Sequence, residues 1–153
     1  MAMPAADVAR RAKRVLIVDD DPATVRLLRD VLGAFRHEHD YQIELAGDGP
    51  EGLAALERNR FDVVLLDIYM PEMSGLELLA RMRGLGLQTP VLMLTGNNDG
   101  RTAGEAVASG ILAYVPKPFD FQRLELLISL ATSSREAAAD GAAAPSPDPR
   151  QDG

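Results

Sequence analysis

Five short aliphatic runs, each followed by a longer amphipathic segment, constrain the fold of this chain more than any other feature. Each run is short enough for one buried strand and is rich in Val, Ile or Leu. The runs are VLIV at 15 to 18, the weaker QIELA at 42 to 46, VVLL at 63 to 66, VLML at 91 to 94 and ILAYV at 111 to 115. This alternation predicts a doubly wound α/β domain, in which helices cover both faces of a five-stranded parallel sheet.

Five helices are expected, because each parallel crossover needs one. The first covers residues 22 to 35 and gathers its bulky apolar side chains on one face, namely Val25, Leu28, Val31, Leu32 and Phe35. The others are expected at residues 50 to 58, 75 to 83, 101 to 109 and 120 to 132.

Both ends of the chain differ from this central pattern. Residues 1 to 13, with Arg10, Arg11 and Lys13, are expected to form a solvated arm, and residues 14 to 132 form the domain. Residues 133 to 153 have almost no bulky apolar side chain and predict a disordered tail or the stub of a linker. A few further helical residues from 136 to 139 would only lengthen the last helix.

Composition excludes several classes of protein. The sequence has no cysteine, which rules out disulfides and thiolate metal sites. Its formal net charge of -7 argues against direct nucleic-acid binding, which depends on clustered Lys and Arg. No apolar run is long enough for a signal peptide core or a membrane span, so we expect a cytoplasmic protein that does not insert into membranes.

Polar side chains follow four of the five predicted strands. Asp19 and Asp20 follow the first strand, Asp67 the third and Thr95 the fourth, and Lys117 lies two residues after the fifth. Because the carboxyl ends of parallel strands meet at one edge of the sheet, these five residues should converge there. Taken singly, Asp67 could be a turn residue, Thr95 a strand-end hydroxyl and Lys117 a solvent-facing lysine.

A carboxylate cluster of this kind suits a hard divalent cation. Neighbouring carboxylates repel one another, and burial raises their pKa values unless a cation compensates. Mg²⁺ prefers oxygen ligands and is commonly held by one or two carboxylates together with a phosphate. Asp67 is then the candidate nucleophile, as aspartates are in aspartyl phosphates. Asp21 is assigned instead to helix capping, because it stands directly before Pro22.

Four separated motifs in the order and spacing of one family accompany these residues. They are LIVDDD at 16 to 21, LLDIYMPEMSG at 65 to 75, LMLTG at 92 to 96 and YVPKPF at 114 to 119. Over residues 14 to 132 the chain resembles the receiver domain of bacterial two-component response regulators. The resemblance implies a flavodoxin-like fold with strand order 2-1-3-4-5.

The resemblance also implies a role for each residue of the cluster. Asp67 would accept a phosphoryl group from a histidine kinase or phosphotransfer protein, with no other enzymatic activity than its own phosphorylation and dephosphorylation. Mg²⁺ would be held by Asp19, Asp20, Asp67 and the backbone carbonyl of Tyr69. Thr95 and Lys117 would bind the phosphoryl oxygens, and the bond between Lys117 and Pro118 would be cis.

A conformational switch is part of the same implied function. On phosphorylation Thr95 would move toward the phosphoryl group and Tyr114 would turn inward. The surface formed by the predicted helix at 101 to 109, the last strand and the last helix would then control a partner or an output domain. Tyr69 and Asn97 would set the lifetime of the phosphoryl group, whereas Met70 and Met73 are assigned to packing.

Alternative interpretations remain open at the level of sequence. A Mg²⁺-dependent phosphatase of the haloacid dehalogenase kind would use Asp19 as the nucleophile and Asp21 as its partner, but this leaves the segment DIYMPEMSG unexplained.

His37 and His39 are assigned to a solvated loop, because no third metal ligand converges with them. The glycine-rich segment at 95 to 100 lacks the lysine of a P-loop. The sequence favours neither a monomer nor a homodimer, and it identifies neither the kinase nor the output partner.

Overall fold

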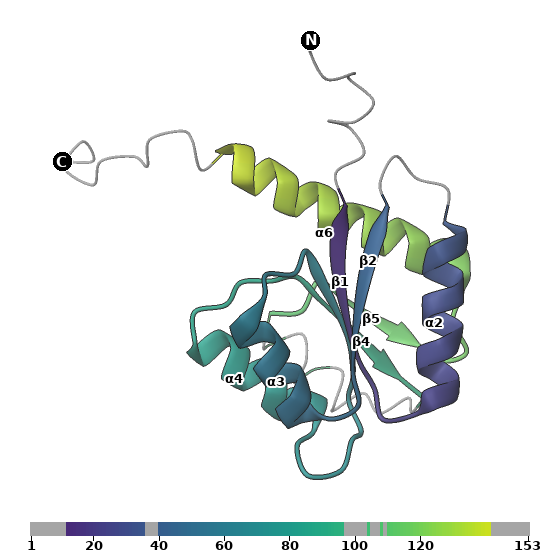
Figure 1. Cartoon of the computed structure of the whole chain (residues 1–153), viewed down its shortest axis with the longest axis vertical. Coiled ribbons are helices and arrows are strands. Elements are labelled where there is room, and N and C mark those ends of the chain that lie inside the picture. The colour runs from purple at the N-terminus through teal and green to yellow at the C-terminus, as the bar shows by residue number, and fades with distance from the viewer. Residues whose placement is uncertain (1–11, 36–39, 97–103, 105–107, 109, 142–153) are drawn as a thin grey trace, which may run out of the picture.

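Five parallel strands pair in the order β2-β1-β3-β4-β5 in the computed structural model of the chain (Figure 1). The structure describes residues 12–35, 40–96 and 110–141, together with positions 104 and 108. The strands are β1 (Lys13–Val18), β2 (Tyr41–Ala46), β3 (Val63–Asp67), β4 (Val91–Thr95) and β5 (Ala113–Pro116). Every neighbouring pair is parallel, so the predicted sheet and its strand order are confirmed.

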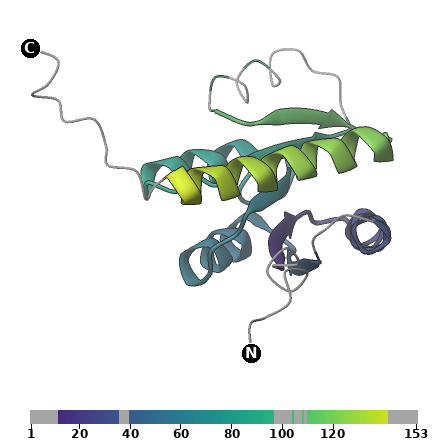
Figure 2. The same ribbon diagram turned by 90° about the horizontal axis from the view of Figure 1, so that it is seen from above.

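Four helices are described, and each follows a strand. They are α2 (Pro22–Ala34), α3 (Gly49–Arg58), α4 (Gly75–Gly84) and α6 (Phe121–Gly141). The helix predicted at 101 to 109 falls almost wholly outside the described residues, so the expectation of five helices reduces to the four seen in the described ranges. Figure 2 shows α2 and α3 on opposite sides of the sheet.

Side chains alternate between the two faces of the sheet and so build two separate apolar layers. In β1, Leu16 and Val18 belong to the layer under α3 and α4, whereas Val15 and Ile17 belong to the layer under α2 and α6. Both layers are fully buried at the central strands, which explains why the runs in β1, β3 and β4 are continuously aliphatic. The predicted apolar face of α2 lies in the second layer, with its members Leu28 and Leu32 fully buried.

Short polar side chains fix the start of three helices. The carboxylate of Asp21 accepts a hydrogen bond from the N–H of Ala23 at 3.1 Å, and Asp48 accepts one from Glu51 at 2.8 Å. The Ser74 hydroxyl accepts one from the N–H of Glu77 at 3.2 Å. Each cap satisfies an N–H that has no partner inside its helix, and so sets where the strand-to-helix turn ends.

Two boundaries differ from the expectation at the ends of the domain. Lys13 is not part of a solvated arm: it is the first residue of β1, is buried, and its N–H donates to the carbonyl of Asp40 at 2.7 Å. The last helix does not stop at Thr132 but continues to Gly141, through a run of alanines with high helix propensity. Figure 1 shows this yellow end of α6 running past β1 on the side away from α2. Within the described residues, no helix combines the length and apolarity needed to cross a membrane.

Truncation of a central strand residue should be costly because the core is buried on both faces. Leu65 lies in the middle of β3 and is fully buried. Leu65→Ala is expected to lower the free energy of unfolding by about 3 kcal/mol, measured by urea denaturation. The matched control is Leu126→Ala on the exposed side of α6, which should change it by less than about 0.5 kcal/mol. Equal losses in the two variants would contradict this description of the core.

Candidate functional site

The register of β1 with β3 brings two aspartates side by side at the carboxyl edge of the sheet. Val18 pairs with Leu66, so Asp19, which directly follows β1, lies beside Asp67, the last residue of β3. Asp19 and Asp67 are buried, with 2% and 6% of their surface exposed, whereas Asp20 is exposed. Carboxylate oxygens from these three residues all lie within 4.8 Å of one another. The sequence therefore identified residues that converge in space.

Lys117 faces this cluster from the far side of the site. Its Nζ lies 3.3 Å from an Asp19 carboxylate oxygen and 3.7 Å from one of Asp67. The backbone holds it there, because the N–H of Lys117 donates to the carbonyl of Thr95 at 2.6 Å. The peptide bond between Lys117 and Pro118 is cis. One ammonium group thus pairs with the two buried carboxylates of the cluster.

The charge of the cluster is only partly neutralised. Burial, followed by the negative charge of Asp19, raises the pKa of Asp67 from 3.8 to about 6, although Lys117 opposes the shift. Burial also raises the pKa of Asp19, against the hydrogen bond from the N–H of Asp21 and the charge of Lys117. Both shifts arise because carboxylates are out of water and close together with too little positive charge nearby.

The donor set fits a hard divalent cation. Carboxylate oxygens from three residues lie close enough together to share one ion, and their excess negative charge favours its binding. Without nitrogen or sulfur donors in this group, the set suits Mg²⁺ better than a softer transition metal.

Asp21 stands next to the cluster but serves a different purpose. Its carboxylate accepts hydrogen bonds from the Thr24 hydroxyl at 2.9 Å and from the N–H of Ala23. These two bonds lower the pKa of Asp21. The capping role expected from the sequence is confirmed, and this carboxylate is not among the three that converge.

Two further predicted residues lie on neighbouring strands. Thr95 ends β4 and is buried, with 1% of its surface exposed. Tyr114 on β5 pairs in register with Met93, two residues before Thr95, and is half-buried against the layer under α3 and α4. Because alternate residues of a strand share a face, Met93 and Thr95 lie on the same side of the sheet.

The segment after β3 packs closely against the site. The Tyr69 side chain is 47% exposed, while Met70 and Met73 are buried in the layer under α3 and α4. Gly75, the first residue of α4, donates its N–H to the carbonyl of Ile68 at 2.8 Å, and a Cβ there would overlap the carbonyl oxygen of Asp67. This contact was not anticipated beyond the motif match, because only the three-dimensional packing requires a glycine at that position.

Several residues singled out in the sequence lie outside the described residues. These are Asn97 and the rest of the segment from 97 to 100, together with His37 and His39.

Comparison with known proteins places the same residues in one family. A model of the response regulator receiver domain matches residues 15–129. The transcriptional regulatory protein ZraR of Klebsiella oxytoca is 38% identical over 115 residues, which cover 75% of this chain and 25% of that protein. The transcriptional regulatory protein TrcR of Mycobacterium tuberculosis is 37% identical over 111 residues, 72% of this chain and 42% of that protein. The chain thus spans less than half the length of these relatives.

Solved structures give the same result at the level of the fold. The CheY-like receiver domain protein of Methanospirillum hungatei superposes with a TM-score of 0.75 at 31% sequence identity. The match covers 84% of this chain and 99% of that one. Vibrio cholerae chemotaxis protein CheY4 superposes with a TM-score of 0.67 at 33% identity, covering 78% of this chain and 97% of that one.

Removing the negative charge of Asp67 should stabilise the fold when no divalent cation is present. From about pH 4 to about pH 6 the folded state binds the Asp67 proton more tightly than the unfolded chain, so stability falls as the pH rises. Asp67→Asn is therefore expected to raise the free energy of unfolding at pH 7.5 by about 2 kcal/mol.

The gain should disappear near pH 4, where Asp67 is protonated in the folded state. Urea denaturation in the presence of a chelator measures the free energy of unfolding at both pH values. Asp30→Asn, at an exposed position of α2, is the matched control and should change this free energy little. An Asp67→Asn protein less stable than the parent at pH 7.5 would contradict the electrostatic description.

Proposed function

The chain belongs to the receiver domain family of two-component response regulators, and we propose that Asp67 is the residue that accepts the phosphoryl group. The observation that carries the proposal is the convergence of three carboxylates and one lysine at the carboxyl edge of the sheet. Within this group Asp67 ends a central strand and has Lys117 beside one of its oxygens.

The phosphoryl transfer needs a carboxylate nucleophile and compensation for the charge of the phosphoryl oxygens. An oxygen of Asp67 forms a bond to phosphorus while the bond to the leaving group, an imidazole nitrogen of a phosphohistidine, breaks. The leaving group keeps the electron pair of that bond. Lys117 is positioned to neutralise phosphoryl oxygens, and the Thr95 hydroxyl supplies a hydrogen-bond donor. The donor is a histidine kinase or a phosphotransfer protein.

Asp19, Asp20, Asp67 and the backbone carbonyl of Tyr69 would hold Mg²⁺. When bound, the ion offsets negative charge on the carboxylates and on the incoming phosphoryl group. The raised pKa of Asp67 supports this assignment, since burial and the nearby charge of Asp19 together outweigh the compensation from Lys117. The proposed dependence on Mg²⁺ therefore follows from the incompletely compensated carboxylates of this cluster.

Phosphorylation would act on a partner through Thr95 and Tyr114. Movement of Thr95 toward the phosphoryl group vacates space on the face of the sheet that Tyr114 also borders. A shift from mostly inactive to mostly active requires about 5 kcal/mol of differential interaction with the two states. Thr95, buried and next to the cluster, is placed to supply part of it.

The output surface is proposed to include β5 and α6. Leu126 and Leu130 lie one turn apart on the exposed side of α6, and Arg123 on the same helix donates to the carbonyl of Tyr114 at 3.4 Å. That bond links the proposed switch residue to the helix. The greater length of the relatives allows an output domain in the same chain as the partner, and the alternative is a separate protein.

The phosphatase alternative receives no support from either kind of observation. It requires Asp21 as an acid beside Asp19, yet the Asp21 carboxylate is occupied as the cap of α2. The family that the chain matches is a signalling family. Proposed enzymatic activity is restricted to self-phosphorylation and dephosphorylation.

Incubation with acetyl phosphate and Mg²⁺ tests the assignment of Asp67. The protein is expected to gain the mass of one phosphoryl group, detected by intact mass spectrometry and mapped to Asp67. Asp67→Asn and removal of Mg²⁺ by a chelator should each abolish the gain, because one removes the nucleophile and the other the compensating charge. Asp21→Asn is the matched control and should still be phosphorylated, since Asn also caps helices. Phosphorylation that persists in Asp67→Asn at wild-type level would overturn the assignment.

The bulk of Tyr69 is expected to slow hydrolysis of the phosphoryl group. Its half-exposed side chain lies two residues after Asp67, where it can obstruct an attacking water. Tyr69→Ala should shorten the half-life by about fivefold, equivalent to roughly 1 kcal/mol of the barrier. Tyr69→Phe retains the ring and should leave the half-life unchanged. The decay of phosphorylated protein after removal of acetyl phosphate measures both, and an identical rate in Tyr69→Ala would show that Tyr69 does not set the lifetime.

A further inference from the structure

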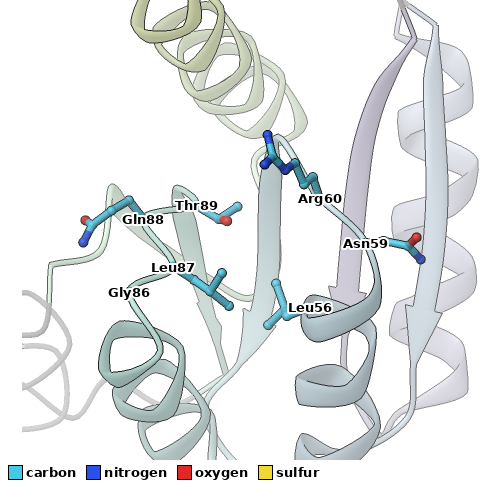
Figure 3. A pocket seen from close by; sticks show the side chains of 7 residues that line it. All are labelled: Leu56, Asn59, Arg60, Gly86, Leu87, Gln88 and Thr89. Carbon is cyan, nitrogen blue, oxygen red and sulfur yellow. The ribbon is translucent and has the colours of Figure 1, made fainter. Parts of the chain in front are cut away.

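An open cleft of about 350 Å³ lies between the end of α3 and the connection from α4 to β4 (Figure 3). The residues that line it precede β3 and β4, so the cleft is at the amino edge of the sheet. The aspartate cluster follows β1 and β3 and is therefore at the opposite edge. None of the residues assigned to phosphoryl transfer takes part in this cleft.

The cleft has an apolar part and a polar part. Figure 3 shows Leu56 and Leu87 facing one another across the cleft, with Arg60 on the same segment as Leu56 and Thr89 on the same segment as Leu87. Leu87 is half-buried, so a bound molecule could cover more of it. An apolar body with a group that the guanidinium can bind would match this division.

Hydrogen bonds fix both walls of the cleft. On one wall, Arg83 donates through Nη1 to the carbonyls of Leu87 at 2.8 Å and Thr89 at 3.0 Å. Its Nη2 donates to the carbonyl of Gly110 at 3.1 Å, which ties the same connection to the segment before β5. On the other wall, the N–H of Asn59 donates to the carbonyl of Ala55 at 2.9 Å. A pre-formed site costs little ordering entropy when a ligand binds.

Arg60 supplies the charge of the cleft. In the part of the chain that the structure describes, no carboxylate forms an ion pair with Arg60, which is exposed at the rim. The acid Glu44 pairs with other residues: its Oε1 accepts from the Asn59 amide at 3.2 Å, and its Oε2, which accepts no hydrogen bond in the described part of the chain, lies 3.8 Å from Arg58. A guanidinium binds a carboxylate through two parallel N–H groups, and Thr89 adds a polar side chain on the opposite wall.

We propose that this cleft binds a small carboxylate with an apolar body, the carboxylate on Arg60 and the body between Leu56 and Leu87. The site is separate from the phosphoryl-transfer site and gives the domain a second input, a small-molecule ligand. Its occupancy does not depend on Mg²⁺ or on the state of Asp67.

The experiment uses the whole unphosphorylated chain without Mg²⁺ and titrates it with phenylacetate, monitored by ¹H–¹⁵N correlation NMR. Saturable shifts are expected at the amides of residues 56 to 60 and 86 to 89, with half-saturation at about 1 mM, as for a fragment-sized ligand. Arg60→Gln should weaken phenylacetate binding by about tenfold. Phenylacetamide, which lacks the charge, should bind the parent protein as weakly as phenylacetate binds the Arg60→Gln variant.

Arg81→Gln is the matched control, since Arg81 is an exposed arginine of α4 that does not line the cleft. It should bind phenylacetate as the parent does. Shifts spread over the surface arginines, equal affinities in Arg60→Gln and Arg81→Gln, or no saturable shift below about 10 mM would each overturn the proposal. Because the titration involves neither Mg²⁺ nor phosphorylation, its failure leaves the function of Asp67 unaffected.

Discussion

The proximity of the Asp19 and Asp67 carboxylates is the interaction on which the rest of this structure depends. It follows from the parallel register of β1 and β3, which ends both strands at the same edge of the sheet. Two buried negative charges side by side are unfavourable, and one lysine at 3.3 and 3.7 Å offsets them only in part. The fold thus stores a local electrostatic cost at the site that we propose for phosphoryl transfer. Binding of a divalent cation or protonation of Asp67 relieves that cost. The stability of the fold should therefore depend on both the pH and the cation concentration.

The surrounding fold makes this cost tolerable and keeps the geometry fixed. Apolar layers on both faces bury the central strands, so the carboxylates sit on rigid elements. Asp21 begins α2 directly after the cluster, and Gly75 lets α4 begin against the backbone of Asp67. A side chain at position 75 would have to displace the carbonyl of the proposed phosphoacceptor. Gly75 and the apolar layers are therefore as necessary to the site as the aspartates themselves.

The pattern of short aliphatic runs was enough to predict the strands, their parallel pairing and the convergence of Asp19, Asp20, Asp67 and Lys117, because strand direction alone determines which ends meet. The prediction for Lys13 was wrong, since a long lysine stem can be buried in a strand although its charge suggests solvent. The extension of α6 to Gly141 was underestimated, because an alanine-rich segment has helix propensity but no apolar periodicity. The cleft at the amino edge has no sequence signature at all, since Leu56, Arg60 and Leu87 become neighbours only through packing.

The central claim is that the carboxylate cluster exists to hold Mg²⁺ beside a phosphoryl group on Asp67. A crystal structure of the protein with Mg²⁺ and beryllium trifluoride, a mimic of the phosphoryl group, tests it most directly. We expect beryllium bound to one carboxylate oxygen of Asp67, with Mg²⁺ coordinated by Asp19, Asp20, the other oxygen of Asp67 and the Tyr69 carbonyl, and with Lys117 on a fluorine. Beryllium trifluoride on another residue, or Mg²⁺ bound away from these aspartates, would contradict it.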